Sequence, residues 1–268
     1  MRQQLSLARL LASAALTTIL AVGVGGCKTM SDITGSLDAR ADARPEADPR
    51  QVAEMYGERY RANPRDAEAG LRYGQALRAS GQRAQAAAVL EQATIANPGN
   101  KALLAGYGRA LGDNGSFQLS FDVLTRAHSP ENPDWRILSV QGTDLDQLGR
   151  HGEARRYYAS ALKIVPEEPS VLSNLGLSYV LSKDLPKAEE VLRRAYASTK
   201  ADARVRQNLG LVVGLQGRFA EAEAIVKADL PPDEAAANAA YLKQMLTRKD
   251  NTRPGAGPIP VASLDQRG

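Results

Sequence analysis

The chain has 268 residues and a formal net charge of +4, from 34 Lys and Arg residues against 30 Asp and Glu residues. Its basic residues are scattered and are not interleaved with aromatic ones, which argues against a nucleic-acid partner. Two histidines and one cysteine are too few for a metal site of recognisable spacing. The sequence also has no phosphate-binding glycine loop and no readable nucleophile–base spacing. We therefore expect a non-catalytic protein that needs neither metal nor cofactor.

The first 26 residues differ in composition from the rest of the chain. Arg2 and Arg9 give this segment a positive start, and the fifteen residues from Leu10 to Val24 carry no charge. A membrane-spanning helix needs about 20 apolar residues, whereas a secretory signal has an apolar stretch of this shorter length. We therefore expect residues 1–26 to be a signal peptide.

The signal peptide is followed by Cys27, the only cysteine in the chain. The preceding Val24-Gly25-Gly26 resembles the end of a bacterial lipobox, which implies that cleavage leaves Cys27 as an acylated first residue. Several acyl chains would hold the protein firmly on a membrane, because one chain alone binds only marginally. By resemblance to the sorting of bacterial lipoproteins, Lys28 favours the outer membrane, with the protein facing the periplasm. The alternatives are an incidental cysteine after an ordinary signal and an uncleaved anchor helix.

Residues 27–49 are polar and poor in large apolar side chains, so we expect a flexible tether there. The structured domain is expected to cover residues 50–248. It opens with a single predicted helix over residues 51–62, in which apolar residues recur every four positions. The Asn-Pro pair after this helix recurs 34 residues later, so the helix is interpreted as a half-repeat that covers the first full repeat.

A fixed period of 34 residues runs through the domain in several columns. One column holds glycine at every place: Gly74, Gly108, Gly142, Gly176 and Gly210. A second holds glycine at four of five places, with Lys183 in the remaining one: Gly81, Gly115, Gly149 and Gly217. A third holds small residues: Ala86, Ser120, Ala154, Ala188 and Ala222. A fourth holds larger ones: Leu90, Leu124, Tyr158, Leu192 and Val226. This period and pattern are typical of tetratricopeptide repeats.

Each repeat is predicted to be a pair of antiparallel helices. In the first repeat we expect helices over about 67–79 and 83–97, with Gly81 ending the first one in a left-handed conformation. Glycine within a helix costs about 1 kcal/mol relative to alanine, so the invariant column at Gly74 indicates a packing need. We expect Gly74 and Ala86 to let the two helices approach closely while Leu90 fills the remaining space.

One helix pair cannot bury its own apolar face, so neighbouring pairs must stack. The sequence therefore predicts an all-α, right-handed solenoid of about five 34-residue helix pairs, with an N-terminal half-repeat and a C-terminal capping helix over about 233–247. Residues 249–268 are rich in proline and glycine, and we expect them to be disordered.

Tetratricopeptide families generally hold an extended peptide or a helix in a concave groove lined by the first helix of each repeat. Carried over by register, the groove positions of repeats one to three are polar and include four arginines: Arg72, Arg78, Arg109 and Arg136. Those of repeats four and five are largely apolar: Asn174, Leu177, Leu181, Arg204, Asn208 and Leu211. This division suits a protein ligand with an apolar helical stripe and an acidic end. Alternatively, the C-terminal helix covers the leucines and the asparagines bond locally.

Two aspartates, Asp144 and Asp146, are two residues apart on one predicted helix. Side chains with this spacing on a helix point in different directions, so the pair is not a candidate for paired-carboxylate chemistry.

The end of the domain carries the most specific resemblance in the chain. Residues 238–246 read Asn-x-x-Tyr-Leu-x-x-Met-Leu. Together with the lipobox and the five repeats, this segment resembles the TadD family of tetratricopeptide lipoproteins from the Tad (Flp pilus) assembly system. The resemblance implies a pilotin-like role in localising, assembling or stabilising an outer-membrane secretin, which would be the protein partner. The alternative is another periplasmic tetratricopeptide lipoprotein, such as an outer-membrane barrel-assembly accessory or a cell-wall hydrolase adaptor.

Overall fold

The computed structural model describes residues 48–227, 229, 240 and 243–244. The predicted signal peptide, Cys27, nearly all of the tether, most of the predicted capping helix and the C-terminal tail lie outside the described residues. No helix in the described part of the chain is long and apolar enough to cross a membrane.

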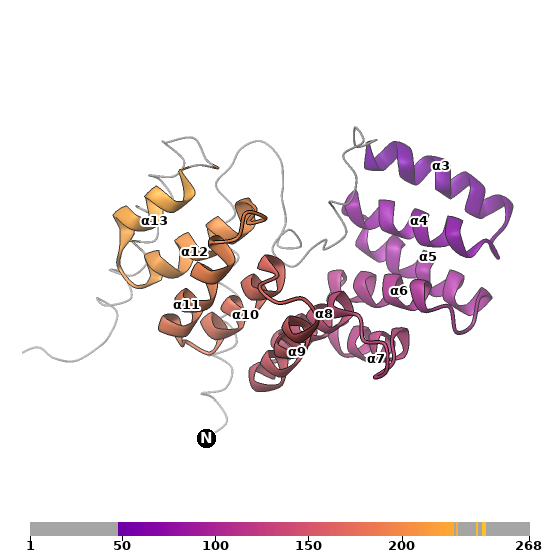
Figure 1. The fold of residues 1–268 in the computed structure, drawn as a ribbon. Helices are drawn as coiled ribbons and strands as arrows, with labels where there is room; N and C mark the ends of the chain where they lie inside the picture. Colours follow the sequence, from indigo (N-terminus) through magenta and orange to yellow (C-terminus); the bar gives the residue numbers. More distant parts are fainter. Residues whose placement is uncertain (1–47, 228, 230–239, 241–242, 245–268) are drawn as a thin grey trace, which may run out of the picture.

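A single helix followed by five helix pairs makes up the described part of the chain (Figure 1). The helices are α3 (Pro49–Ala62), α4 (Ala67–Ala79), α5 (Arg83–Ala96), α6 (Lys101–Asp113), α7 (Phe117–Ala127), α8 (Trp135–Gln147), α9 (His151–Ile164), α10 (Pro169–Leu181), α11 (Leu185–Tyr196), α12 (Ala203–Leu215) and α13 (Phe219–Val226). Each helix packs against the next one in the chain. The all-α repeat solenoid predicted from the sequence is therefore confirmed.

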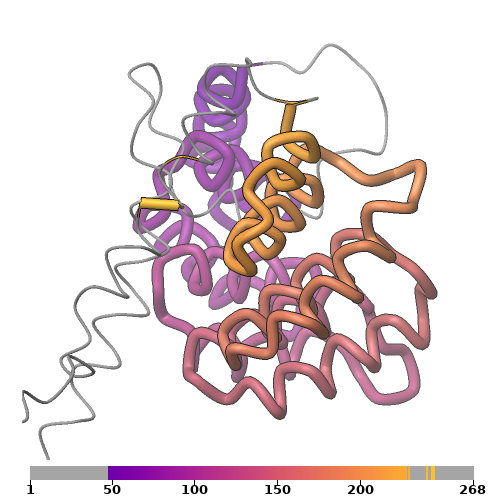
Figure 2. The backbone as a smooth tube through the Cα atoms, turned by 90° about the vertical axis from the view of Figure 1, so that its left-hand side faces the viewer, coloured from indigo at the N-terminus to yellow at the C-terminus, as the bar shows by residue number. Residues whose placement is uncertain are grey.

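The stack of helices follows an arc, with α3 to α5 at one end, α11 to α13 at the other and α8 between them (Figures 1 and 2). The first helix of each pair also contacts the first helix of the next pair, from α4 through α6, α8 and α10 to α12. These five helices therefore form one continuous wall along the array.

The turn within each pair repeats a helix-ending motif that needs a left-handed residue. In the first pair, Gly81 has a φ of +78°, and the N–H of Gln82 donates to the carbonyl of Leu77 at 2.8 Å. This is the hydrogen bond of a Schellman motif, which satisfies a carbonyl that the helix leaves without a partner. In the fourth pair Lys183 adopts the same conformation with a φ of +64°, although a side chain disfavours it.

The invariant glycines lie where the two helices of each pair come closest. A Cβ atom built on Gly74 would lie 2.4 Å from Cγ of Leu90, and one built on Gly142 would lie 2.5 Å from Cε1 of Tyr158. The same clash, at 2.5 to 2.6 Å, would arise at the other three members of the column, against Leu124, Leu192 and Val226. The glycine column and the column of large residues therefore face each other in every pair.

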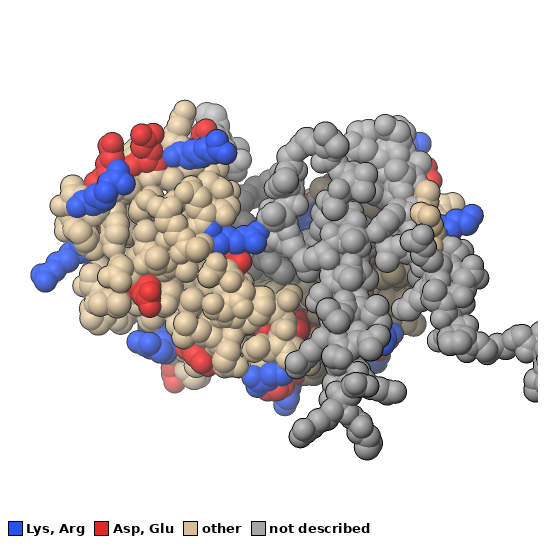
Figure 3. Space-filling model, turned by 180° about the vertical axis from the view of Figure 1, so that it is seen from behind, with Lys and Arg blue, Asp and Glu red and all other residues tan. Residues whose placement is uncertain are grey.

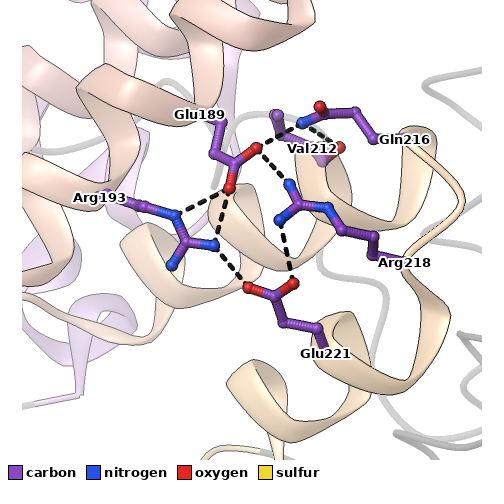
Figure 4. A network of polar contacts seen from close by, with 6 residues as sticks. All are labelled: Glu189, Arg193, Val212, Gln216, Arg218 and Glu221. Atoms are coloured by element: carbon purple, nitrogen blue, oxygen red, sulfur yellow. Dashed lines mark hydrogen bonds and ion pairs between the residues drawn. The ribbon is translucent and has the colours of Figure 1, made fainter.

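The last helix pair is also tied to its neighbour by charge. Glu189 and Arg193 of α11 and Arg218 and Glu221 near the start of α13 form a closed ring of alternating charges (Figure 4). Arg193 lies 2.5 Å from Glu221, and Arg218 lies 3.0 Å from the same carboxylate. Gln216, directly after α12, donates to Glu189 at 2.7 Å. The ring links α11 to α13, and Gln216 adds the end of α12.

Replacing Gly142 with alanine tests the close approach directly. Tyr158 is 1% exposed and cannot swing away, so we expect Gly142→Ala to destabilise the fold by about 1–3 kcal/mol through overpacking. The matched control is Gly152→Ala in α9, where a Cβ would meet nothing within 4 Å. That change should stabilise the helix by about 0.5–1 kcal/mol. Urea denaturation of the two variants measures both effects, and shifts of the same sign would contradict this account.

Candidate protein-binding surface

The ten groove residues predicted from register all lie on the wall of first helices. The structure places two of them on α4, one on α6, one on α8, three on α10 and three on α12. Leu177 and Leu181 of α10 and Leu211 of α12 are partly exposed, and the two helices that carry them are in contact. A buried apolar cluster that includes Leu209 and Val213 lies within the last pairs. The leucines therefore give this part of the wall an apolar stretch of partly exposed side chains, next to a buried apolar cluster.

The two asparagines have a different role from the leucines. Asn174 is 8% exposed and Asn208 is 7% exposed. The side-chain amide of Asn174 donates to Oγ of Ser139 at 3.1 Å, and that of Asn208 donates to Oγ of Ser173 at 2.8 Å. Each bond joins one first helix to the first helix of the preceding pair. The geometry therefore favours the alternative in which these asparagines bond within the array.

The arginines of the wall also differ from one another. Arg78 forms an ion pair with Asp113 on the next first helix at 2.6 Å, with both side chains largely buried. Arg136 is exposed, and its guanidinium lies 4.5 Å from the centre of the Trp135 ring. Arg72 is exposed on α4. The remaining two lie partly buried on α6 and α12: Arg109 and Arg204. Among the five predicted groove arginines, Arg72 and Arg136 are therefore the exposed ones.

Charges of both signs are interspersed over the described surface seen from behind (Figure 3). This distribution matches the scattered basic residues of the sequence. Among the residues that the structure describes, no group of three or more His, Cys, Asp and Glu side chains could hold a metal ion.

At the middle of the wall, α8 carries an unusual set of buried polar side chains: Ser139, Gln141, Asp144 and Asp146. Asp146 accepts hydrogen bonds from Nδ1 of His151 at 2.9 Å, from the hydroxyl of Tyr158 at 3.0 Å and from Oγ of Ser178 at 2.8 Å. Burial raises the pKa of Asp146, and these three donors act in the opposite direction. Asp146 therefore joins α8 to the helices that follow it.

Asp144 faces the other way, toward the preceding pair. Its Oδ2 lies 2.6 Å from Oγ of Ser120, which in turn lies 2.7 Å from the carbonyl oxygen of Gly108. Asp144 is 1% exposed, and burial raises its pKa to about 8. The two aspartates point apart, as predicted, and each one joins α8 to a different neighbour.

Sequence reasoning missed these contacts between pairs, although the sequence contains a partial signal for one of them. Serine recurs after 34 residues at Ser139 and Ser173, and asparagine does so at Asn174 and Asn208. A serine at one repeat position and an asparagine at the next position allow the asparagine of one first helix to donate to the serine of the preceding first helix.

Comparison with known proteins agrees with this architecture. A family model for tetratricopeptide repeats matches residues 71–134 and 140–204. A comparison with curated protein sequences found no match.

Several solved structures have the same fold. The chain is similar to PilW, described as a widely conserved type IV pilus biogenesis factor, with a TM-score of 0.63 and 19% identity over 72% of this chain and 91% of PilW. It is similar to TTC0263, a tetratricopeptide protein of Thermus thermophilus, with a TM-score of 0.58 and 22% identity over 66% of this chain and 99% of that one. A match to the Cut9–Hcn1 hetero-tetramer of the APC/C has a TM-score of 0.61 and 16% identity; it covers 75% of this chain but only 40% of the matched chain.

At these identities the structural matches establish the fold alone. The 34-residue period, the five stacked helix pairs and the family match nevertheless lead to one assignment. The chain is a tetratricopeptide repeat protein, a member of a class of protein-binding scaffolds.

Proposed function

We propose that this protein is a lipid-anchored assembly factor of the outer membrane, facing the periplasm, that acts like a pilotin on the secretin of a Tad (Flp) pilus or a related secretion apparatus. The anchor is proposed from the lipobox at Cys27. The pilus role is proposed from the TadD-like segment over residues 238–246. The likeness to the fold of a type IV pilus biogenesis factor is compatible with that role.

The feature that carries the proposed binding activity is the apolar stretch formed by Leu177, Leu181 and Leu211. Partly exposed leucines on two helices that contact each other offer a surface that an apolar stripe of a partner helix can bury. The exposed guanidinium groups of Arg72, at the other end of the same wall on α4, and of Arg136, at its middle on α8, are suited to an acidic end of that partner. We propose that a secretin segment with this chemistry binds here.

Placing charge on the leucine stretch should abolish partner binding. The test uses a periplasmic form with an ordinary secretory signal in place of residues 1–26 and Cys27→Ala. We expect this form to recover a secretin in a pull-down, and Leu177→Asp with Leu211→Asp to weaken that binding by more than about tenfold, or about 1.4 kcal/mol, because a partner would have to bury two carboxylates.

The matched control is Leu119→Asp on α7, a leucine that is 48% exposed and lies away from the first-helix wall. It should bind as well as the unchanged protein, and circular dichroism should show the same melting curve for all forms. Equal loss of binding in the control and in the double variant would contradict the groove. Recovery of barrel-assembly subunits or cell-wall hydrolases in place of a secretin would favour the alternative lipoprotein function.

The lipid anchor has a separate test. The same soluble form, with Cys27→Ala and an ordinary secretory signal, should fractionate with periplasmic proteins, while the unchanged chain should fractionate with the outer membrane because its acyl chains insert into the bilayer. Metabolic labelling with a radioactive fatty acid should mark only the chain that retains Cys27. Membrane fractionation of both forms, or no label on the unchanged chain, would contradict lipidation.

A further inference from the structure

Three oxygen atoms are linked by two short contacts at the junction of the second and third helix pairs. The carbonyl oxygen of Gly108 is 2.7 Å from Oγ of Ser120, and that Oγ is 2.6 Å from Oδ2 of Asp144. Both distances are those of O–H···O hydrogen bonds, so each contact needs a hydrogen atom between its two oxygens. The carbonyl has no hydrogen to give, and a serine hydroxyl has only one. The second hydrogen must come from the Asp144 carboxyl group.

We propose that Asp144 is protonated in the folded protein at neutral pH and donates this proton in a hydrogen bond to Ser120. The packing of the second helix pair against the third, and with it the stability of the solenoid, then depends on the protonation of Asp144. Ser120 then donates its own hydrogen to Gly108, and both contacts are satisfied. Loss of the proton would leave one pair of oxygens in contact with no hydrogen between them, inside a site where Ser120 is 0% exposed and Asp144 is 1% exposed.

The surroundings of Asp144 favour the neutral carboxyl. From α6, Asp113 faces it with a like charge, and α7 contributes the uncharged Ser120. On its own helix Asp146 lies two residues away, and from α9 Tyr158 interacts with both aspartates. His151 of α9 bonds to Asp146, and Arg78 of α4 is paired with Asp113. Burial is the main cause that raises the pKa of Asp144 to about 8, and Asp113 adds to it. A hydrogen bond donated by Ser120 to Asp144 would act in the opposite direction, but in the proposed arrangement Ser120 donates to Gly108.

Asp146 provides a comparison within the same helix. It is also buried, at 7% exposed, but three donors point at it from His151, Tyr158 and Ser178. An ionised carboxylate accepts such bonds with both of its oxygens. The two aspartates therefore differ in their surroundings: Asp146 lies among two hydroxyl donors and a histidine ring nitrogen, whereas the one hydroxyl beside Asp144 is already needed by Gly108.

The sign of the pH dependence follows from this difference. An unfolded aspartate titrates near pH 4, and the folded Asp144 has its pKa raised to about 8. Between these values the folded state holds one more proton than the unfolded state, so stability falls as pH rises. A difference of one bound proton raises the unfolding equilibrium constant about tenfold per pH unit between these two pKa values. Below and above this pH range, the contribution of Asp144 to the free energy of unfolding does not change with pH.

The experiment compares the unchanged protein with Asp144→Asn in urea denaturation between pH 5 and 9.5. An asparagine amide can donate to Ser120 at every pH, so its contribution does not vary with pH. The unfolding constant of the unchanged protein, divided by that of Asp144→Asn, should therefore rise by about tenfold per pH unit up to about pH 8 and then level off. Asp122→Asn, at an exposed carboxylate on α7, is the control and should follow the unchanged protein. Asp146→Asn should unfold more readily at pH 7, because it replaces one of the two oxygens that accept from Tyr158 and Ser178 with an amide nitrogen that cannot accept.

Carbon-13 NMR of the carboxyl groups tests the same site without any substitution. The Asp144 signal, assigned by its loss in Asp144→Asn or by sequential assignment, should titrate near pH 8 in the folded protein. A folded-state titration near pH 4, or a ratio of unfolding constants that does not vary with pH, would overturn the proposal.

Discussion

The close approach of two helices at one glycine per repeat is the constraint on which the rest of the structure depends. At Gly74 and its four equivalents there is no room for a single methyl group, because a large side chain from the second helix occupies that space. This contact sets the distance between the helices of a pair, and that distance sets the face that each pair offers to its neighbours. Since each pair contacts mainly its neighbours, an error at one glycine would disturb the array locally before it spread.

Contacts between successive pairs change in character along the chain. Near the start, the α3–α5 end is an apolar cluster that includes the aromatic pair Tyr60 and Tyr73. At the middle, α8 contributes buried polar groups to both neighbours, and the asparagine–serine bonds follow on α10 and α12. Buried polar groups of this kind must be fully satisfied, because an unpaired one costs more than an apolar replacement. They therefore make the register between pairs specific.

The 34-residue period is sufficient to predict the helices, because each repeat has the same pattern of small, large and helix-ending residues. The first helix was expected over 67–79 and is observed at Ala67–Ala79, and the left-handed turn at Gly81 was also predicted. Register further placed the groove residues on one wall. It could not say how Arg78 or Asn174 would use their polar atoms, since that depends on a partner 35 residues away and on the volume left between two helices. For Asp144 the spacing predicts only that it points away from Asp146, because burial depends on neighbours that spacing does not reveal.

The ring of Glu189, Arg193, Arg218 and Glu221 gives the two ends of the array different sensitivities to ionic strength. Three of its four side chains are about two-fifths exposed, so dissolved ions can screen the attractions between them. At the α3 end, one exposed ion pair of Arg59 with Asp66 accompanies apolar and aromatic packing, which salt does not weaken. In dilute buffer we expect the helices at both ends to stay packed, whereas in concentrated sodium chloride local unfolding should begin at α13 while α3 stays packed. The ionic strength of the solution thus decides which end of the solenoid unfolds first.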